Sequence, residues 1–281
     1  MKKACDLHTH SIYSDGTFTP SQIINEAIKI GLSAVALTDH NTVDGLTDFI
    51  EAAKGKDIEI VPGAEFSVDY NGKELHVLGL FIPEEKFSEV SALMLDVNSR
   101  KEASNVSLIE SLARAGYPLD YEAIKASTPN GKVNRAHVAI ALTQKGYTSS
   151  KDEAFATLLS PKAGHYKEPQ RLTAFEIIDF IVSIGAVPVL AHPFLNLDKQ
   201  ELIEFLSEAK KHGLAGMECY YSTYDQENTD ASVRLAERFG IICSGGSDFH
   251  GATKPDISLG TGKGDLLVPT KCYLMLKNTI S

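Results

Sequence analysis

The sequence predicts an α/β barrel that is interrupted by a small helical insert. Short apolar runs ending in polar residues alternate with helical patterns, which is typical of βα units and a mostly parallel sheet. The strand signal disappears from about Glu84 to about His165 and resumes near Val187. Since 281 residues suit one barrel with an insert, we expect the barrel at 1–83 and 166–281 and the insertion subdomain at 84–165.

The barrel elements follow from apolar periodicity. The expected strands are Ala4–Leu7, Ala34–Thr38, Ile58–Pro62, Val187–Ala191, Gly216–Tyr220 and Ile241–Gly245. The expected helices are Pro20–Ile30, Val43–Ala53, Thr173–Ile184, Lys199–His212 and Asp225–Phe239. Asn71-Gly72 lies between two apolar runs and predicts a hairpin turn, so Glu65–Phe81 is expected to contain an antiparallel excursion. Breaks in the insert are expected at Gly116, Pro118, Pro129 and Gly131.

Composition excludes several classes of protein. The net charge of −10 argues against a protein that holds long nucleic acid by its general surface field, so an anionic substrate must be bound locally. No run approaches the roughly 18 apolar residues of a membrane span. The first residues lack the apolar stretch of a secretion signal, and a cytoplasmic location is expected. The four cysteines form no CxxC pair, which favours buried free thiols over a zinc ribbon or a disulfide framework.

Six of the nine histidines lie at the ends of predicted strands, each with an acid or a tight turn nearby. His8 and His10 alternate on an extended segment and therefore point the same way. Asp248 and His250 repeat this spacing near the end of the chain. Because the carboxyl ends of parallel barrel strands converge on one rim, we expect these groups to meet in space.

These residue types indicate a metal site. Imidazole with carboxylate suits Zn²⁺, Mn²⁺ or Fe²⁺, whereas Mg²⁺ and Ca²⁺ favour oxygen ligands. A lone His or acid is more often a hydrogen-bonding residue or a helix cap, but the joint pattern favours two or three divalent ions, especially if Glu65 bridges. Several ions together would activate water and clamp a phosphoryl group, which predicts hydrolysis. The candidate ligands are His8, His10, Asp15, His40, Glu65, His76, His192, Asp248 and His250.

The motifs that carry these ligands resemble those of the PHP (polymerase and histidinol phosphatase) family. The matching segments are Asp6–Ser11, Ser14–Gly16, Thr38–Asn41, Gly63–Glu65, Ala191–Pro193 and Gly246–Gly251. The resemblance implies a distorted (β/α)7 barrel and a metal-dependent phosphoesterase with a trinuclear site. It assigns His8, His10, Glu65 and Asp248 to one ion, Glu65, His76 and His192 to a second, and Asp15, His40 and His250 to a third. Asp15 stands where some relatives carry His.

The insert bears on the choice of substrate. Val133–Ala139 resembles a segment of the stand-alone PHP phosphoesterases similar to RNase AM, although Asn134 and Ala136 depart from the usual Gly and Pro. Arg135 and His137 are the candidate phosphate contacts, and the alternatives are a surface ion pair and a helix-start cap. Lys167 and Lys254 are weaker candidates. Tyr220, Tyr221 and Tyr224 are candidates to stack on a base or to pack in the core.

The resemblance implies hydrolysis of the 3′-phosphate of nucleoside 3′,5′-bisphosphates, or 5′-to-3′ trimming of short oligonucleotides. The ions and Arg135 would neutralise charge on the phosphoryl group, and Asp248 or His192 would relay protons. The partner is then a small phosphorylated substrate and not a membrane. One alternative is a histidinol-phosphate phosphatase, and another is a non-catalytic metal-binding PHP module that acts with a partner. An amidohydrolase is less favoured, since no lysine ends a predicted strand.

Overall fold

The computed structural model describes residues 4–128, 133–167 and 171–280. The chain forms two compact units, one made of Met1–Ala92 and Arg171–Ser281 and the other of Leu93–Gln170. The first boundary, between Ala92 and Leu93, falls inside the long helix α3, Phe87–Arg114. The breaks expected at Pro129 and Gly131 lie outside the described residues. In the part of the chain that is described, no helix combines the length and the apolarity of a membrane span.

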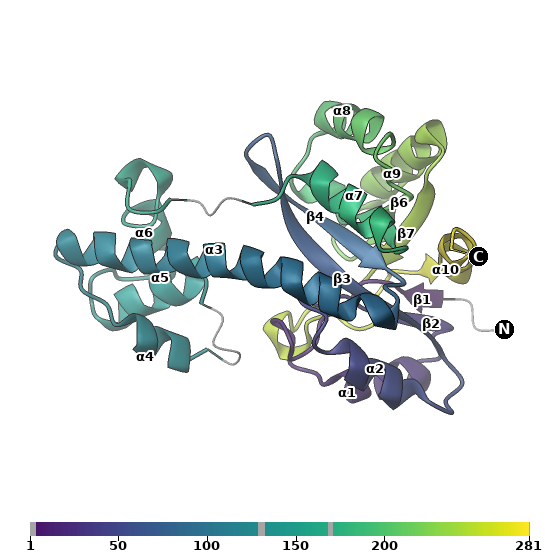
Figure 1. Cartoon of the computed structure of the whole chain (residues 1–281), viewed down its shortest axis with the longest axis horizontal. Helices are drawn as coiled ribbons and strands as arrows, with labels where there is room; N and C mark the ends of the chain where they lie inside the picture. The colour runs from purple at the N-terminus through teal and green to yellow at the C-terminus, as the bar shows by residue number, and fades with distance from the viewer. Residues whose placement is uncertain (1–3, 129–132, 168–170, 281) are drawn as a thin grey trace. The chain divides into compact units, whose positions relative to one another are not determined.

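The first unit contains an eight-stranded sheet in the order β7-β6-β5-β4-β3-β2-β1-β8 (Figure 1). The strands are β1 (Ala4–Asp6), β2 (Ala34–Leu37), β3 (Glu59–Tyr70), β4 (Lys73–Leu80), β5 (Val187–Leu190), β6 (Gly216–Tyr221), β7 (Ile242–Gly246) and β8 (Val268–Pro269). Pairing is parallel except where β4 meets β3 and β5 and where β8 meets β1. The predicted α/β barrel is therefore confirmed, including its antiparallel excursion.

Backbone hydrogen bonds join the first and seventh strands. Leu7 N donates to Gly245 O at 3.2 Å, and just beyond the strands Asp248 N donates to His8 O at 2.9 Å. Glycine is required on this side of the barrel, because a Cβ at position 246 would lie 2.3 Å from the Cβ of His8. β1 to β7 thus form a nearly closed barrel, and β8 pairs antiparallel with β1 at the edge of the sheet.

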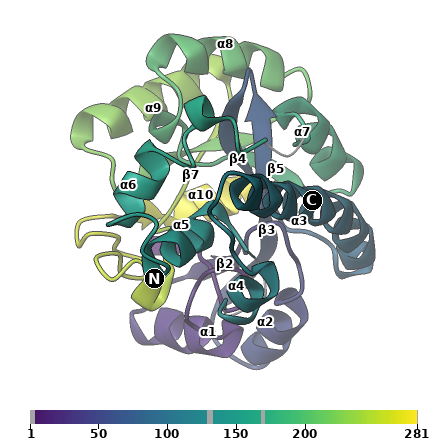
Figure 2. The ribbon, with the colours of Figure 1, turned by 90° about the vertical axis from the view of Figure 1, so that its left-hand side faces the viewer.

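Helices surround the strands of this unit, as Figure 2 shows. They are α1 (Pro20–Lys29), α2 (Leu46–Ala53), α7 (Ala174–Ser183), α8 (Lys199–Ala209), α9 (Gln226–Phe239) and α10 (Thr270–Lys277). Capping boxes at Thr19, Thr173 and Asp198 fix where three of them begin, because each cap side chain accepts from the third helical amide. The 3-10 turns of this unit are Glu84–Lys86, Pro193–Leu195 and Gly251–Thr253.

The second unit is helical in its described residues. Besides most of α3 it contains α4 (Tyr121–Ala126), α5 (Arg135–Gln144), α6 (Lys151–Ala156) and the 3-10 turn Pro161–Ala163. Its core is formed by apolar side chains of these helices, among them Leu108, Leu112, Val138, Leu142 and Ala154. This unit therefore buries a hydrophobic cluster of its own.

Several element boundaries differ from the prediction. β3 runs to Tyr70 instead of ending at Pro62, because it continues directly into the hairpin. The hairpin turn has positive φ at Asn71 (54°) and Gly72 (78°), as expected for Asn-Gly. α2 begins at Leu46 and not at Val43. β8 and α10 were not predicted, since two residues and eight residues respectively carry too little periodicity.

Candidate metal centre

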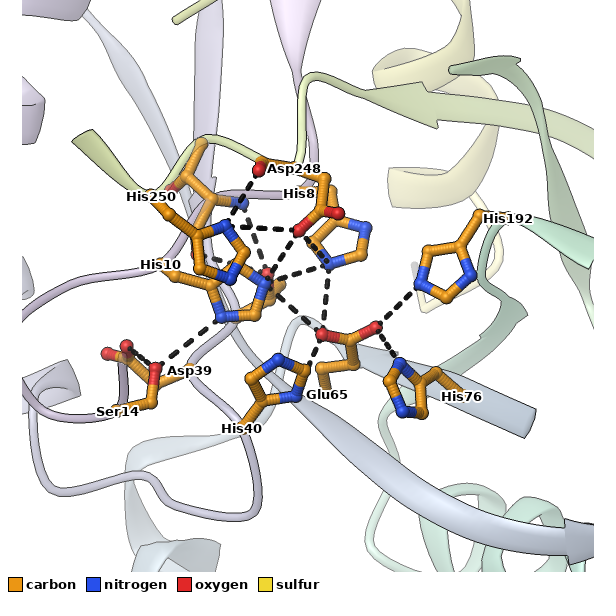
Figure 3. A network of polar contacts seen from close by, with 12 residues as sticks. His8, His10, Ser14, Asp39, His40, Glu65, His76, His192, Asp248 and His250 are labelled. Atoms are coloured by element: carbon orange, nitrogen blue, oxygen red, sulfur yellow. Dashed lines mark hydrogen bonds and ion pairs between the residues drawn. The ribbon is translucent and has the colours of Figure 1, made fainter. Parts of the chain in front are cut away.

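Six strands bring the predicted ligands to one place (Figure 3). His8 and His10 follow β1, His40 follows β2, and His192 follows β5. Glu65 and His76 lie within the hairpin strands β3 and β4, and Asp248 and His250 follow β7. Since the segments that follow the strands of a barrel meet at one rim, residues up to 242 positions apart in sequence converge, from His8 to His250.

The first group consists of His8, His10, Glu65 and Asp248, all buried. The Nε2 atoms of His8 and His10 are 3.0 Å apart. Glu65 Oε2 lies 3.1 Å from His8 Nε2 and 3.2 Å from His10 Nε2. Asp248 Oδ1 lies 3.6 Å and 3.2 Å from the same two nitrogens. Two imidazoles and two carboxylates therefore point at one small volume.

Glu65 extends this group to a second one. Its Oε1 lies 2.8 Å from His76 Nδ1 and 3.0 Å from His192 Nε2. Its Oε2 lies 3.1 Å from His40 Nδ1. His40, Glu65 and His76 have ligand atoms close enough to share an ion. Glu65 thus presents one oxygen to each of two sets of imidazoles.

The third group consists of His10, Asp15, His40 and His250. Asp15 Oδ1 lies 3.1 Å from His250 Nε2 and 3.8 Å from His10 Nδ1. Asp15 Oδ2 lies 3.8 Å from His40 Nε2. Its side chain is 52% exposed, in contrast to the buried first group. His10 faces both groups, with Nε2 toward the first and Nδ1 toward the third.

The donor set fits divalent cations. Glu65 Oε2 is buried and makes no hydrogen bond, although three imidazole nitrogens lie within 3.2 Å of it. A buried carboxylate oxygen is normally hydrogen-bonded, and nitrogens gathered around it without hydrogen-bond geometry suit coordination of a shared ion. The ligand atoms within each group lie within 4.8 Å of one another. Nitrogen and oxygen donors together suit zinc, manganese or iron.

The electrostatics of the centre are strongly coupled. Burial disfavours protonation of His10 and His76, but Asp248 and Glu65 raise the pKa of His10 to about 9, and Glu65 raises the pKa of His76 to about 10. Burial lowers the pKa of His40 to about 3. Burial works against ionisation of Glu65 and Asp248, yet the neighbouring imidazoles hold the pKa of each carboxyl well below its usual value. The centre therefore combines two ionised carboxylates with protonated rings at His10 and His76 and a neutral ring at His40.

Strained backbone occurs at three residues of the centre. His192 has φ 28° and ψ 54°, Asp248 has φ 56°, and Asn41 has φ 48°. Non-glycine residues adopt positive φ at a cost of about 1–3 kcal/mol each, and such residues cluster at functional sites. Neighbouring groups stabilise each conformation, as when Asn41 N donates to Glu65 O at 2.8 Å. The positive-φ conformation gives the side chains of these residues directions that they would not have on an ordinary extended or helical backbone.

Three buried acids that hold the ligand loops were not among the residues predicted from the sequence. Asp6 accepts hydrogen bonds from the amides of Ser247 and Gly260, both at 2.8 Å. Asp39 accepts from Ser11 N at 2.7 Å and from Ser14 Oγ at 2.6 Å. Asp6 and Asp39 stand inside the quoted motifs. The signal for the third acid, Glu218, was a charge in the middle of an apolar strand.

Two further side chains contact Asp248. Lys254, predicted to bind phosphate, places Nζ 2.7 Å from Asp248 Oδ2 and is 41% exposed. The Tyr221 hydroxyl donates to the same oxygen at 2.8 Å and is buried. Tyr220 instead packs against the hydrophobic core, and the Tyr224 hydroxyl accepts from Phe194 N. Of the three tyrosines, Tyr221 is the one that reaches the centre.

The helical unit carries the other phosphate candidates. The Arg135 guanidinium lies 4.4 Å from the centre of the Tyr166 ring. Asn134 caps α5 and accepts from His137 N, while His137 Nδ1 accepts from Asn134 N, so His137 also has the capping role named as its alternative. Burial and then Lys101 lower the pKa of His137. Lys167 is exposed, and its carbonyl accepts from Ser104 Oγ.

Comparisons with known proteins agree with this geometry. The model of the PHP domain family matches residues 6–147. A 5′-3′ exoribonuclease of Haemophilus influenzae is 30% identical, over 89% of this chain and 91% of its own length. A phosphoribosyl 1,2-cyclic phosphate 1,2-diphosphodiesterase of Eggerthella lenta is 31% identical, over 88% and 94%. A 3′,5′-nucleoside bisphosphate phosphatase of Chromobacterium violaceum is 28% identical, over 87% and 86%.

A solved structure shares the fold. It is a presumed metal-dependent phosphoesterase from Bifidobacterium adolescentis, with a TM-score of 0.76 and 25% identity, and the match covers 97% of this chain and 94% of that one. Both the matched family model and the 31% identical relative span half of the chain or more. The chain therefore belongs to the PHP domain family and is a metal-dependent phosphoesterase.

Proposed function

We propose that the chain hydrolyses phosphoesters of small nucleotides at a centre of two or three divalent ions. The substrates would be nucleoside 3′,5′-bisphosphates, which lose the 3′-phosphate, and short oligonucleotides trimmed from the 5′ end. The observation that carries the proposal is the position of Glu65, whose two oxygens each face a separate set of imidazoles within 3.2 Å. The exoribonuclease and the bisphosphate phosphatase among the relatives support this substrate class.

Nine residues would hold the ions. We assign His8, His10, Glu65 and Asp248 to the first, Glu65, His76 and His192 to the second, and Asp15, His40 and His250 to the third. The contacts of each set support its assignment, and His10 and His40 also lie within reach of a neighbouring set. When bound, the ions would activate water for attack at phosphorus and offset the charge of the phosphoryl oxygens. The mixed donors favour Mn²⁺, Zn²⁺ or Fe²⁺ over Mg²⁺.

We place proton transfer on Asp248. One of its oxygens faces His8 and His10, and the other accepts from Tyr221 and from the partly exposed Lys254. This arrangement connects the carboxylate to solvent. We give His192 the role of a ligand alone, because its Nε2 faces Glu65 Oε1 at 3.0 Å. Lys254 is also placed to bind a phosphate oxygen at the edge of the centre.

Arg135, His137 and Lys167 are proposed to bind phosphate groups of the substrate. Stacking on Tyr166 orients the guanidinium of Arg135, which favours paired hydrogen bonds to phosphate oxygens. The first turn of α5 adds amide donors beside it. Arg135 and Lys167 carry the positive charge that complements the negative charge of a phosphate group.

A substrate panel tests the proposal. Metal-free protein loaded with Mn²⁺, Zn²⁺ or Fe²⁺ is assayed on adenosine 3′,5′-bisphosphate, a 5′-phosphorylated RNA trimer, phosphoribosyl 1,2-cyclic phosphate and histidinol phosphate. We expect the highest kcat/KM on the first two. Preference for the cyclic phosphate would move the chain toward its Eggerthella relative. Preference for histidinol phosphate would reject the nucleotide assignment, and no turnover on any compound would favour a non-catalytic module.

A further inference from the structure

We infer that Glu218 is a positioning residue that orients both His8 and His192 and so joins two parts of the metal centre. The inference rests on the proposed ligand roles of these histidines. Glu218 is the third residue of β6 and is fully buried. Burying a carboxylate in an apolar strand is unfavourable unless each oxygen is hydrogen-bonded, so the two contacts it makes identify what it does.

The first oxygen of Glu218 fixes the ring of His8. Glu218 Oε1 lies 3.0 Å from His8 Nδ1, and a carboxylate can only accept, so Nδ1 carries the proton. The opposite nitrogen, Nε2, then presents its lone pair where Glu65, Asp248 and His10 converge. A carboxylate behind a metal-binding imidazole is a recurrent way to set ring orientation and basicity.

The second oxygen stabilises the strained backbone of His192. His192 N donates to Glu218 Oε2 at 2.8 Å. His192 has φ 28° and ψ 54°, a left-handed conformation that histidine adopts only when its surroundings hold it. This conformation directs Nε2 toward Glu65 Oε1 at 3.0 Å. Without the acceptor, the segment would be free to relax and turn the imidazole away.

Together these contacts link Glu218, His8, Glu65 and His192 in a ring. Glu218 Oε1 contacts His8 Nδ1 at 3.0 Å, and His8 Nε2 contacts Glu65 Oε2 at 3.1 Å. Glu65 Oε1 contacts His192 Nε2 at 3.0 Å, and His192 N returns to Glu218 Oε2 at 2.8 Å. Glu65 and Glu218 therefore contact the same two histidines, each through different nitrogen atoms. A substitution of Glu218 should weaken both ion sites without removing a ligand.

The test compares Glu218→Gln with Cys219→Ala. Glutamine keeps the shape but places an NH₂ group, which donates and cannot accept a hydrogen bond, where the carboxylate has its second oxygen. Cys219 is the next residue of β6, is also buried, and its thiol contacts Met217 O, so its variant controls for disturbance of the strand. Mn²⁺ binding is titrated by calorimetry into metal-free protein. We expect Glu218→Gln to weaken binding by about 10–100-fold and excess Mn²⁺ to restore part of the activity, with Cys219→Ala close to the wild type.

A spectroscopic measurement separates positioning from general damage. In ¹⁵N spectra of the zinc-loaded wild type, His8 should show a protonated Nδ1 with a strongly hydrogen-bonded signal, which Glu218→Gln should shift or lose. Unchanged Mn²⁺ affinity together with an unchanged His8 signal would overturn the role of Glu218. Failure of the wild type itself to bind Mn²⁺ or Zn²⁺ would overturn the metal centre, and this result is distinguishable because it appears before any substitution. Glu218→Leu, which removes both acceptors, should weaken Mn²⁺ binding at least as much.

Discussion

Replacing Glu65 with glutamine should destabilise the metal-free protein and abolish hydrolysis. The carboxylate is fully buried, and five imidazoles lie within 3.2 Å of its oxygens. Removing one partner of a buried ion pair leaves the other charge uncompensated, which costs about 3–5 kcal/mol. At about 2–4 °C per kcal/mol for a protein of this size, the melting temperature should fall by about 6–20 °C.

The loss of stability caused by Glu65→Gln should depend on pH. Glu65 has a pKa held well below its usual 4.5, so its contribution to stability is present above that value and is lost as the pH falls. His10 and His76 have a pKa raised from 6.5 to about 9 and about 10, so their contribution is full below 6.5 and is lost as the pH rises through the higher values. The difference between wild type and variant should therefore be largest between about pH 5 and 8.

Thermal unfolding of the metal-free proteins across this pH range measures the effect. Glu59→Gln is the matched control, because Glu59 lies on the same strand with a side chain that is 58% exposed and contacts Tyr273 and Lys277. Surface pairs of this kind contribute about 0–1 kcal/mol. The convergence of imidazoles on Glu65 does not hold the centre together if Glu65→Gln has the same melting temperature as Glu59→Gln at pH 7. The same follows if Glu65→Gln still turns over substrate with Mn²⁺.

Three further outcomes are expected. Loading metal-free protein with Mn²⁺ at pH 7.5 should release protons from the imidazoles around Glu65, measured as a dependence of the calorimetric heat on buffer; buffer-independent heats would contradict the raised pKa values. Tyr221→Phe removes a donor from Asp248 and should lower kcat about tenfold or more with KM little changed, and an unaltered kcat would show that this bond is dispensable. Arg135→Ala should raise KM and lower kcat/KM by roughly 1.5–3 kcal/mol, with Arg114→Ala on the exposed end of α3 as control; equal kinetics of the two variants would remove Arg135 from the substrate site.

The sequence predicts the barrel and the convergence of the nine candidate ligands because both follow from local rules. Alternation on an extended segment makes His8 and His10 point the same way, and parallel strands bring their carboxyl ends to one rim. The turn at Asn71-Gly72 has the backbone that its residues favour. Assignment of these residues to particular ions depends on the resemblance to the PHP family.

Other features depend on contacts that no local rule supplies. Glu218 is 210 residues from His8 along the chain, so its hydrogen bond to that ring appears only once β6 is placed. The irregular register of β6 against β7 between Glu218 and Tyr220 is equally hidden in sequence. A strict alternation from Glu218 would direct Tyr220, not Tyr221, toward the centre. The bulge reverses this, and Tyr221 becomes the residue that binds Asp248.

The closure of the barrel and the geometry of the centre depend on the same bonds. Asp6 ends β1 and accepts from the amide and the hydroxyl of Ser247, which follows β7. His8 lies two residues beyond Asp6, and Asp248 directly follows Ser247, so this pairing sets the distance between the two ligands. A variant such as Asp6→Asn would replace one acceptor oxygen by a donor at a fully buried position. Asp6→Asn should therefore lower both the stability and the metal affinity of the protein. Substitution of Glu218 should lower the metal affinity more than the stability.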